Sequence, residues 1–301
     1  MMELEARRKK LFGLAYRMTG SAADADDVVQ ETFLRALASP PPDTKNPEPW
    51  LVTVALNVAR DRLRKRRRES SRGPWLPSPI DASELELEPP SMDDPGTEAR
   101  YSMLESVSFA FLLALEALTP MQRAVLLLRD VLDYSAEETA RAIGSTAGAV
   151  KVQLLRARRK MASYERRRGP TDYAATQDAL VRFLTALRDE DSAAVEALLT
   201  EDAVAKTDAG GEFLAAGVDL VGPRRIAQAL IGIRKKAPDL VRFEVKPLNG
   251  APFFVGEQDS TTPKVARHFA MACELDRDGK IRAFYTVLAT AKLRWTSAPA
   301  R

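Results

Sequence analysis

The sequence predicts a multidomain protein: two all-α helical modules, the second with a helix-turn-helix, followed by an α+β cone. Residues 132–161 contain two short helical patterns joined by a Gly-Ser-Thr turn. An acidic, proline-rich stretch separates this region from an earlier helical one. After Gly169-Pro170, helices give way to alternating strand patterns. These observations place the helical modules at 1–69 and 101–168, a linker at 70–100 and the cone at 171–295.

The helix-turn-helix is predicted to begin at Ser135, which stands three residues before Glu138 as in a capping box. An apolar helix over 103–118 and a helix capped by Thr119-Pro120 precede it. Gly144 can adopt the left-handed conformation that ends a helix sharply. The second helix places apolar residues on one face, namely Val150, Leu154, Ala157 and Met161. Its other face is cationic and hydrogen-bonding: Lys151, Gln153, Arg156, Arg158, Arg159 and Lys160. This surface suits the major groove of DNA, and it suits a solvated helical hairpin equally well.

Charge is distributed unevenly along the 301 residues, although the net charge is only +3. Lysine and arginine are in excess in residues 1–70 and 101–168, and acidic residues are in excess in 71–100, which predicts two basic modules joined by an acidic connector. No apolar run is long enough to span a bilayer, so we expect a cytoplasmic protein without a membrane partner. The single cysteine, Cys273, and the single histidine, His268, exclude a disulfide framework and a Cys/His zinc site, and we expect no cofactor.

Three helices are predicted in the first module. Residues 3–19 carry an apolar face, and Thr19-Gly20-Ser21 ends that helix and caps the next, at 22–38. Asp24, Asp26 and Asp27 fall in the first turn of the second helix, where they suit the helix dipole better than a metal site, because no further ligand accompanies them. After a proline-rich loop, WLVTVALNVARDRLRKRRR predicts a third helix with apolar residues inward and Asn57 among arginines on the other face.

The linker over 70–100 lacks hydrophobic periodicity, but the segment RGPWLPSPID within it differs from the rest because it contains large apolar side chains. Trp75 and Leu76 lie between prolines, which limit the entropy lost when the pair is buried. We expect this pair to anchor the linker to another part of the protein. A tryptophan packed locally in a loop is the alternative.

The cone is predicted from helices that precede a strongly curved antiparallel sheet. Two helices and a strand over 203–207 come first, then a helix over 223–235. Four strands follow, at 241–247, 252–255, 264–275 and 280–287, and the last two form a hairpin across Asp278-Gly279.

The helix-turn-helix stretch, YSAEETARAIGSTAGAVKVQLLRARRKM, resembles region 4 of the extracytoplasmic-function sigma factors, which are promoter-selecting subunits of bacterial RNA polymerase. The usual wording of that region is close to Y-x-E-I-A-x-x-L-G-x-x-x-G-T-V-K-S-R-L-x-R-A-R. It is matched here at Gly144, Gly148, Val150, Lys151, Leu154, Arg156, Ala157 and Arg158. The departures, at Ala149, Val152 and Gln153, fall on the face that would contact bases. The resemblance implies that the minus-35 element is bound by Thr146, Ala149, Lys151, Val152, Gln153, Arg156 and Arg158.

The first module resembles region 2 of the same family. Its second helix, DADDVVQETFLRA, is similar to the segment that docks on the clamp of the polymerase largest subunit. This implies core polymerase contacts by Asp26, Asp27, Gln30, Glu31, Phe33 and Arg35. The third helix resembles the segment that recognises the minus-10 element and holds an unpaired base, which implies DNA contacts by Asn57, Arg60, Asp61 and Arg64.

The C-terminal portion resembles the SnoaL-like members of the NTF2-like superfamily, which extend one subgroup of these sigma factors. The subgroup's linker motif, W-L-P-E-P, is present as residues 75–79 with one change, and its D-G-G-G-K motif is present in weakened form at 208–212. Its N-P-D-K-L motif is reduced to Lys292-Leu293. The resemblance implies interdomain contacts by Trp75, Leu76, Asp208, Gly210 and Gly211.

The function implied is that of a sigma factor that directs RNA polymerase to promoters, is not an enzyme and is regulated by its own SnoaL-like domain. Core RNA polymerase and promoter DNA are the implied partners. A polymerase-independent helix-turn-helix regulator, or a cyclase or isomerase with a DNA-binding appendage, are the alternatives. In the cone only Asp208 and His268 are candidate catalytic residues; we expect protein binding there before a small-molecule ligand, and a ligand before catalysis.

Overall fold

The structure is a computed structural model that describes residues 7–39, 41–43, 45–69, 73–81, 85, 100–167, 172–236, 240–260, 262–294 and 296. The chain forms two compact units. The first contains Met1–Ser70 and Ala82–Arg168, and the second contains Ser71–Asp81 and Gly169–Arg301. Both helical modules thus belong to one unit, and the Trp75 segment of the linker belongs to the unit that contains the cone.

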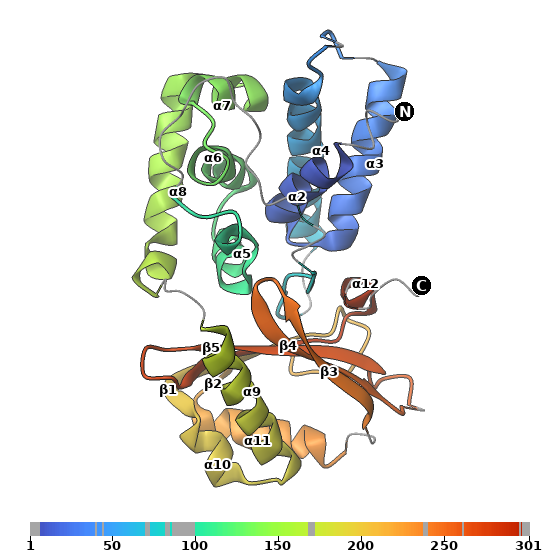
Figure 1. Ribbon diagram of the computed structural model, residues 1–301, viewed down its shortest axis with the longest axis vertical. Coiled ribbons are helices and arrows are strands. Elements are labelled where there is room, and N and C mark those ends of the chain that lie inside the picture. The colour runs from blue at the N-terminus through green and yellow to red at the C-terminus, as the bar shows by residue number, and fades with distance from the viewer. Residues whose placement is uncertain are drawn as a thin grey trace. The chain divides into compact units, whose positions relative to one another are not determined.

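The first module is built from α2 (Arg8–Thr19), α3 (Ala22–Ala38) and α4 (Glu48–Glu69), which pack against one another (Figure 1). Gly20 ends α2 with a φ of 66°, and the Ser21 hydroxyl caps α3 by accepting a hydrogen bond from the Asp24 amide at 3.2 Å. The predicted bounds of α3 are therefore confirmed. The predicted start of the first helix, at residues 3–6, lies outside the described residues.

The acidic start of α3 forms ion pairs with arginines. Asp26 contacts Arg8 at 2.5 Å, and Asp27 contacts Arg62 at 2.9 Å. In the described part of the chain, no three histidine, cysteine or acidic side chains gather as a metal site requires. No described helix is long and apolar enough to cross a membrane.

The second module contains a short 3-10 turn η2 (Glu105–Val107) and the helices α5 (Phe109–Leu115), α6 (Pro120–Asp130), α7 (Ala136–Ile143) and α8 (Ala147–Arg167). The single helix predicted over 103–118 is wrong, because Ser108 is extended (ψ 148°) and caps α5 through its hydroxyl. The predicted capping of α6 is confirmed: Thr119 and Gln122 form a reciprocal capping box. The core of this module includes Phe111, Leu127 and Met161, all fully buried.

The second unit begins with α9 (Tyr173–Arg188), α10 (Ser192–Ala197) and β1 (Leu199–Asp208). It continues with β2 (Leu220–Val221), α11 (Pro223–Arg234), β3 (Leu240–Leu248), β4 (Ala251–Gln258), β5 (His268–Leu275), β6 (Ile281–Val287) and α12 (Thr290–Leu293). The six strands form one sheet in the order β2-β1-β6-β5-β4-β3. The β5–β6 hairpin is confirmed, whereas β2 and α12 were not predicted.

The two faces of this sheet have different coverings. Helices α9, α10 and α11 lie on one side and α12 on the other (Figure 1). The helix-covered face holds the hydrophobic core, in which Phe183 and Phe284 pack at a ring-centroid distance of 4.7 Å. Asp208, at the end of β1, and Lys292, in α12, both bond to Leu76 of the linker.

Candidate nucleic-acid interface and linker anchor

The helix-turn-helix exposes most of the residues predicted to contact the minus-35 element. Ser135 and Glu138 form the predicted capping box, and Gly144 ends α7 with a φ of 65°. Along α8 the exposed positions include Ala149, Lys151, Val152 and Arg156, with Gln153 half-buried. Val152 is 48% exposed although it is apolar, as a side chain meant for a partner surface would be.

Two of the predicted minus-35 residues are engaged within the protein. The Thr146 hydroxyl caps α8 by accepting a hydrogen bond from the Ala149 amide at 3.2 Å. Arg158 donates two hydrogen bonds, at 2.9 and 2.6 Å, to the buried carboxylate of Asp130 on α6. These hydrogen bonds raise the pKa of Arg158 above its usual value. They also hold α8 against α6. Both residues orient α8. Sequence spacing alone did not distinguish this orienting role from contact with bases.

The residues predicted to contact the minus-10 element lie along α4. Asn57, Asp61 and Arg64 are exposed, and Arg64 pairs with Asp61 at 2.7 Å. Arg60 is only 8% exposed, since α4 packs against α7 at this point. Its guanidinium donates to the Asn57 amide oxygen at 3.2 Å and to the Ile143 carbonyl at 3.5 Å. Burial, with Arg64 nearby, lowers the pKa of Arg60.

Buried arginines join the two helical modules near the end of α2. Arg123 donates to the Met18 carbonyl at 2.8 Å, to the Leu115 carbonyl at 2.7 Å and to Glu116 at 2.7 Å. Arg66, at the basic end of α4, donates to the same Glu116 carboxylate at 2.8 Å. Burial raises the pKa of Glu116, but the charges of Arg123 and Arg66 outweigh it, and the net shift is downward.

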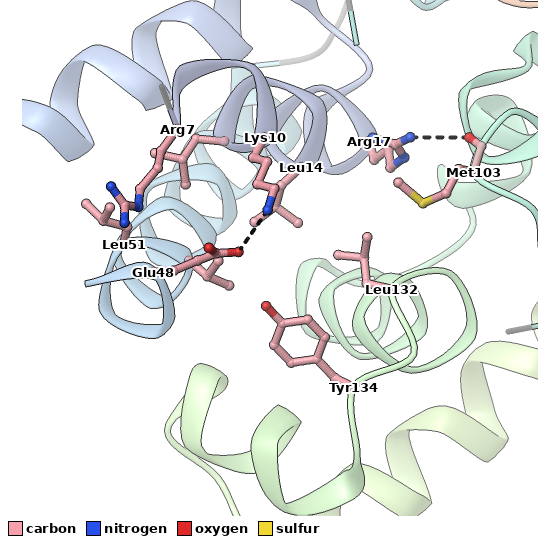
Figure 2. Close-up of a pocket in the computed structure, with 11 residues that line it drawn as sticks. Arg7, Lys10, Leu14, Arg17, Glu48, Leu51, Met103, Leu132 and Tyr134 are labelled. Atoms are coloured by element: carbon pink, nitrogen blue, oxygen red, sulfur yellow. Dashed lines mark hydrogen bonds and ion pairs between the residues drawn. The ribbon is translucent and has the colours of Figure 1, made fainter. Parts of the chain in front are cut away.

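A second contact between the modules surrounds a small cavity of about 40 Å³. Figure 2 shows Arg17 of α2 reaching the Met103 carbonyl, at 3.2 Å, while Leu132 and Tyr134 line the wall contributed by the second module. Arg17 also donates to the Ser106 hydroxyl at 2.7 Å. Burial lowers the pKa of Arg17 to about 10. Burial, with Glu48 and Glu138 nearby, raises the pKa of Tyr134 to about 12.

The face of α3 predicted to bind polymerase is largely exposed. Asp27, Gln30 and Arg35 are exposed, and Asp26, Glu31 and Phe33 are half-buried. Sequence reasoning missed Leu34 and Leu37, which are 61% and 65% exposed on the same helix. Their spacing of three residues beside Gln30 was the available signal, because it continues one face of α3 with large apolar side chains in solvent.

The linker is anchored to the second unit through its main chain. The Leu76 amide donates to Oδ2 of Asp208 at 2.8 Å, and the Leu76 carbonyl accepts from Nζ of Lys292 at 2.5 Å. Lys292 also pairs with Asp208 at 2.5 Å and stands 4.5 Å from the centre of the Trp75 ring. Leu76 is fully buried. The structure thus brings together Trp75, Leu76 and Asp208, and adds Lys292 as their common partner.

The loop after Asp208 fits closely against the start of α12. Gly210, with a φ of 59°, leaves no room for a side chain, because an added Cβ would lie 2.9 Å from that of Ala289. Glu212 accepts a hydrogen bond from the Thr290 amide at 3.2 Å. Gly211 also has positive φ, at 76°, but open space around it. Further along the linker, Ile80 exchanges hydrogen bonds with Asn249 in the β3–β4 turn.

Comparisons with known proteins agree with this geometry. Residues 4–69 match the family described as Sigma-70 region 2, and residues 108–161 match Sigma-70, region 4. The chain is 29% identical over 293 residues to the ECF RNA polymerase sigma factor SigJ of Mycobacterium tuberculosis, across 95% of this chain and 90% of that protein. It is 33% identical over 156 residues to EcfG of Rhodopseudomonas palustris, across 51% of this chain and 77% of the relative. The crystal structure of M. tuberculosis SigJ covers all of this chain, with 99% of its own length aligned, a TM-score of 0.70 and 25% identity.

Proposed function

The chain belongs to the extracytoplasmic-function sigma factors of bacterial RNA polymerase, and we propose a role for each of its exposed surfaces. The exposed face of α8 binds the minus-35 element, and α4 binds the minus-10 element. The exposed face of α3 docks on the clamp of the polymerase largest subunit. The SnoaL-like unit regulates these three activities by holding the linker at Asp208 and Lys292.

The α8 surface is the observation that carries the DNA-binding part of the proposal. Lys151 and Arg156 are exposed and can neutralise phosphates, while Val152 and Gln153 stand where bases would be contacted. Arg158 positions the helix through Asp130. The bonds that the protein makes to itself therefore orient α8 and leave its outer face to DNA.

Binding at the minus-10 element requires α4 to separate from α7. Arg60 is buried under α7, and its Nε is one of the few buried donors in the described residues without a hydrogen-bond partner. An unsatisfied buried donor costs about 1–3 kcal/mol. Separation exposes Arg60 to phosphate beside Asn57, so promoter DNA gains a contact that the closed arrangement lacks.

Docking on polymerase is supported by the composition of the α3 face. Charged and amide groups, Asp27 and Gln30, stand beside the exposed apolar residues Leu34 and Leu37. A docking surface of this kind combines an apolar centre with a polar rim. Replacing Leu34 and Leu37 by Gln should therefore weaken polymerase binding without lowering stability, because neither side chain is buried in the free protein.

Run-off transcription with core polymerase tests the proposal as a whole. The full-length protein should direct specific initiation from its promoters, and the Leu34→Gln, Leu37→Gln double variant should lose it together with co-purification of core enzyme. A Val181→Gln variant, which changes an exposed apolar residue on α9, is the matched control. Specific promoter binding and regulation that need no polymerase would instead support an independent helix-turn-helix regulator.

A catalytic role for the cone is not part of the proposal. Its relatives SigJ and EcfG are named as sigma factors. Of the two candidate catalytic residues, Asp208 is bonded to Leu76 and Lys292, which occupy its carboxylate. His268 lies on the face of the sheet away from the hydrophobic core. Turnover of a small molecule by the full-length protein would overturn this part.

A further inference from the structure

A cavity of about 540 Å³ lies in the second unit, between the sheet and α12. Its walls include β3, β4 and β5 at Arg242, Glu257 and His268, which are neighbours in register across the three strands. Phe254 of β4 points to the opposite face and packs against the hydrophobic core. None of the described lining residues belongs to that core. Its volume falls in the range of roughly 300–1,000 Å³ that is typical of small-molecule sites.

The lining combines apolar walls with an excess of positive charge. Val255, Leu288 and Leu293 supply apolar surface. Three arginines, Arg242, Arg267 and Arg294, line the cavity together with two glutamates, Glu244 and Glu257.

The ion pairs leave one of these arginines for a ligand. Glu257 pairs with Arg267 at 3.2 Å and with Arg242 at 3.7 Å, and Glu244 pairs with Lys246 at 2.9 Å outside the lining. No ion pair with a described residue involves Arg294, which directly follows α12. A ligand with a negatively charged group would therefore supply the counter-ion that Arg294 lacks among the described residues. An apolar ligand body would fit the rest of the cavity wall.

The cavity shares α12 with the linker anchor. Thr290 and Leu293 line the cavity, and Lys292 on the same four-residue helix holds the Leu76 carbonyl and Asp208. Because α12 is only about one turn long, we expect it to move as a unit. A molecule that contacts Leu293 and Arg294 therefore acts on the element that holds Lys292 against the linker.

We propose that this cavity binds an amphipathic small-molecule acid, with its carboxylate at Arg294 and its apolar body against Val255, Leu288 and Leu293. Binding shifts α12 and so changes the strength with which Lys292 and Asp208 hold Leu76. The binding site stands on its own residues, whereas the effect on the linker rests on the proposed regulatory function.

Equilibrium binding to the full-length protein tests the site. Decanoate and 4-phenylbutyrate are the probes, with decanol and 4-phenylbutanol as neutral controls, and titration calorimetry is the measurement. We expect saturable binding of at least one acid, weakened at least tenfold by Arg294→Gln. Arg277→Gln, which changes an exposed arginine in the β5–β6 turn, should leave it unchanged. Failure of both acids to bind, equal binding of the alcohols, or equal effects of the two variants would overturn the site.

Hydrogen exchange of the Leu76 amide tests the coupling. Coupling between sites usually amounts to a factor of about 5 or more, so the bound acid should change the exchange rate of this amide about fivefold in the wild type. The same acid should leave the Ala205 amide, in the middle of β1, unaffected. An acid that binds through Arg294 without changing Leu76 exchange would refute the coupling. Neither measurement needs polymerase, so failure here is distinguishable from failure of the protein to direct transcription.

Discussion

Single buried polar groups decide how the parts of each unit are held. Arg17 and Arg123 are each 1% exposed, and their guanidinium groups bond to the main-chain carbonyls of Met103, in the turn before η2, and Met18, near the end of α2. Neither was predicted, because a long basic side chain in a helical pattern is usually solvated. Their partners, such as the Met18 carbonyl, belong to the main chain and leave no trace in residue type. Burial of such groups therefore follows from the packing of distant helices and cannot be derived from local periodicity.

Asp208→Asn should loosen the linker anchor. Asp208 is 4% exposed and its carboxylate faces Lys292, so the variant leaves an ammonium group without its counter-ion. We expect the unfolding free energy of the second unit to fall by about 3 kcal/mol. The Leu76 amide should also exchange faster, as measured by hydrogen exchange in urea. Asp202→Asn, at an exposed position of the same strand, is the control, and an equal loss in both variants would contradict the role of the pair.

Elements with local end signals were predicted well, and elements defined by tertiary contact were not. The starts of α3 and α7 follow from the caps Ser21 and Ser135, and the start of α11 follows from Pro223, whose fixed φ suits the first helical position. These signals act within one turn. By contrast, α12 has only four residues and no side-chain cap, and β2 has only two. The latter exist because the chain packs there against Asp208 and β1.

Two arginines on α8 allow contact with DNA to be tested separately from orientation of this helix. Arg156→Ala should weaken promoter binding by the holoenzyme and reduce the slope of log K against log[salt] by about 0.9, as expected for one lost phosphate contact. Arg158→Ala should instead lower stability by about 2–3 kcal/mol, since it leaves Asp130 buried without its partner. Fluorescence anisotropy across a salt series and urea unfolding are the measurements. An unchanged salt slope in Arg156→Ala would remove that residue from the interface.

The contact between the helical modules should be sensitive to acid through Glu116. Its pKa is lowered in the folded protein, because Arg123 and Arg66 outweigh the effect of burial. Its stabilisation is therefore complete above the ordinary glutamate value of about 4.5 and is lost as pH falls through the lower folded-state value. Glu116→Gln should lower the unfolding free energy by about 2 kcal/mol at pH 7, and the difference from wild type should shrink below pH ~4.5. Urea unfolding as a function of pH checks this, and a difference that does not depend on pH would exclude the ion pairs as its cause.

The linker belongs to the second unit as much as to the connection between the helical modules. Residues 71–81 group with the cone because Leu76 and Ile80 bond to Asp208 and Asn249. The resemblance pointed to Trp75 and Asp208, and the structure brings them to one site. It could not supply the Leu76 main-chain bonds or Lys292 as the shared partner, since both depend on where α12 packs.

The change Trp75→Ala tests whether this anchor affects transcription. The variant removes the ring that lies 4.5 Å from Nζ of Lys292, a contact worth about 0.5–2 kcal/mol, so the linker amides should exchange faster in the full-length protein. Run-off transcription should change about two- to thirtyfold, as that energy implies. In a chain ending at residue 168 the same substitution should have no effect, because Asp208 and Lys292 are absent. Trp50→Ala, in α4 of the first unit, should act equally in both chains and serves as the control. An effect of Trp75→Ala that is equal in the two chains would mean that the tryptophan acts locally in the linker, and no effect in either would mean that the anchor does not regulate initiation.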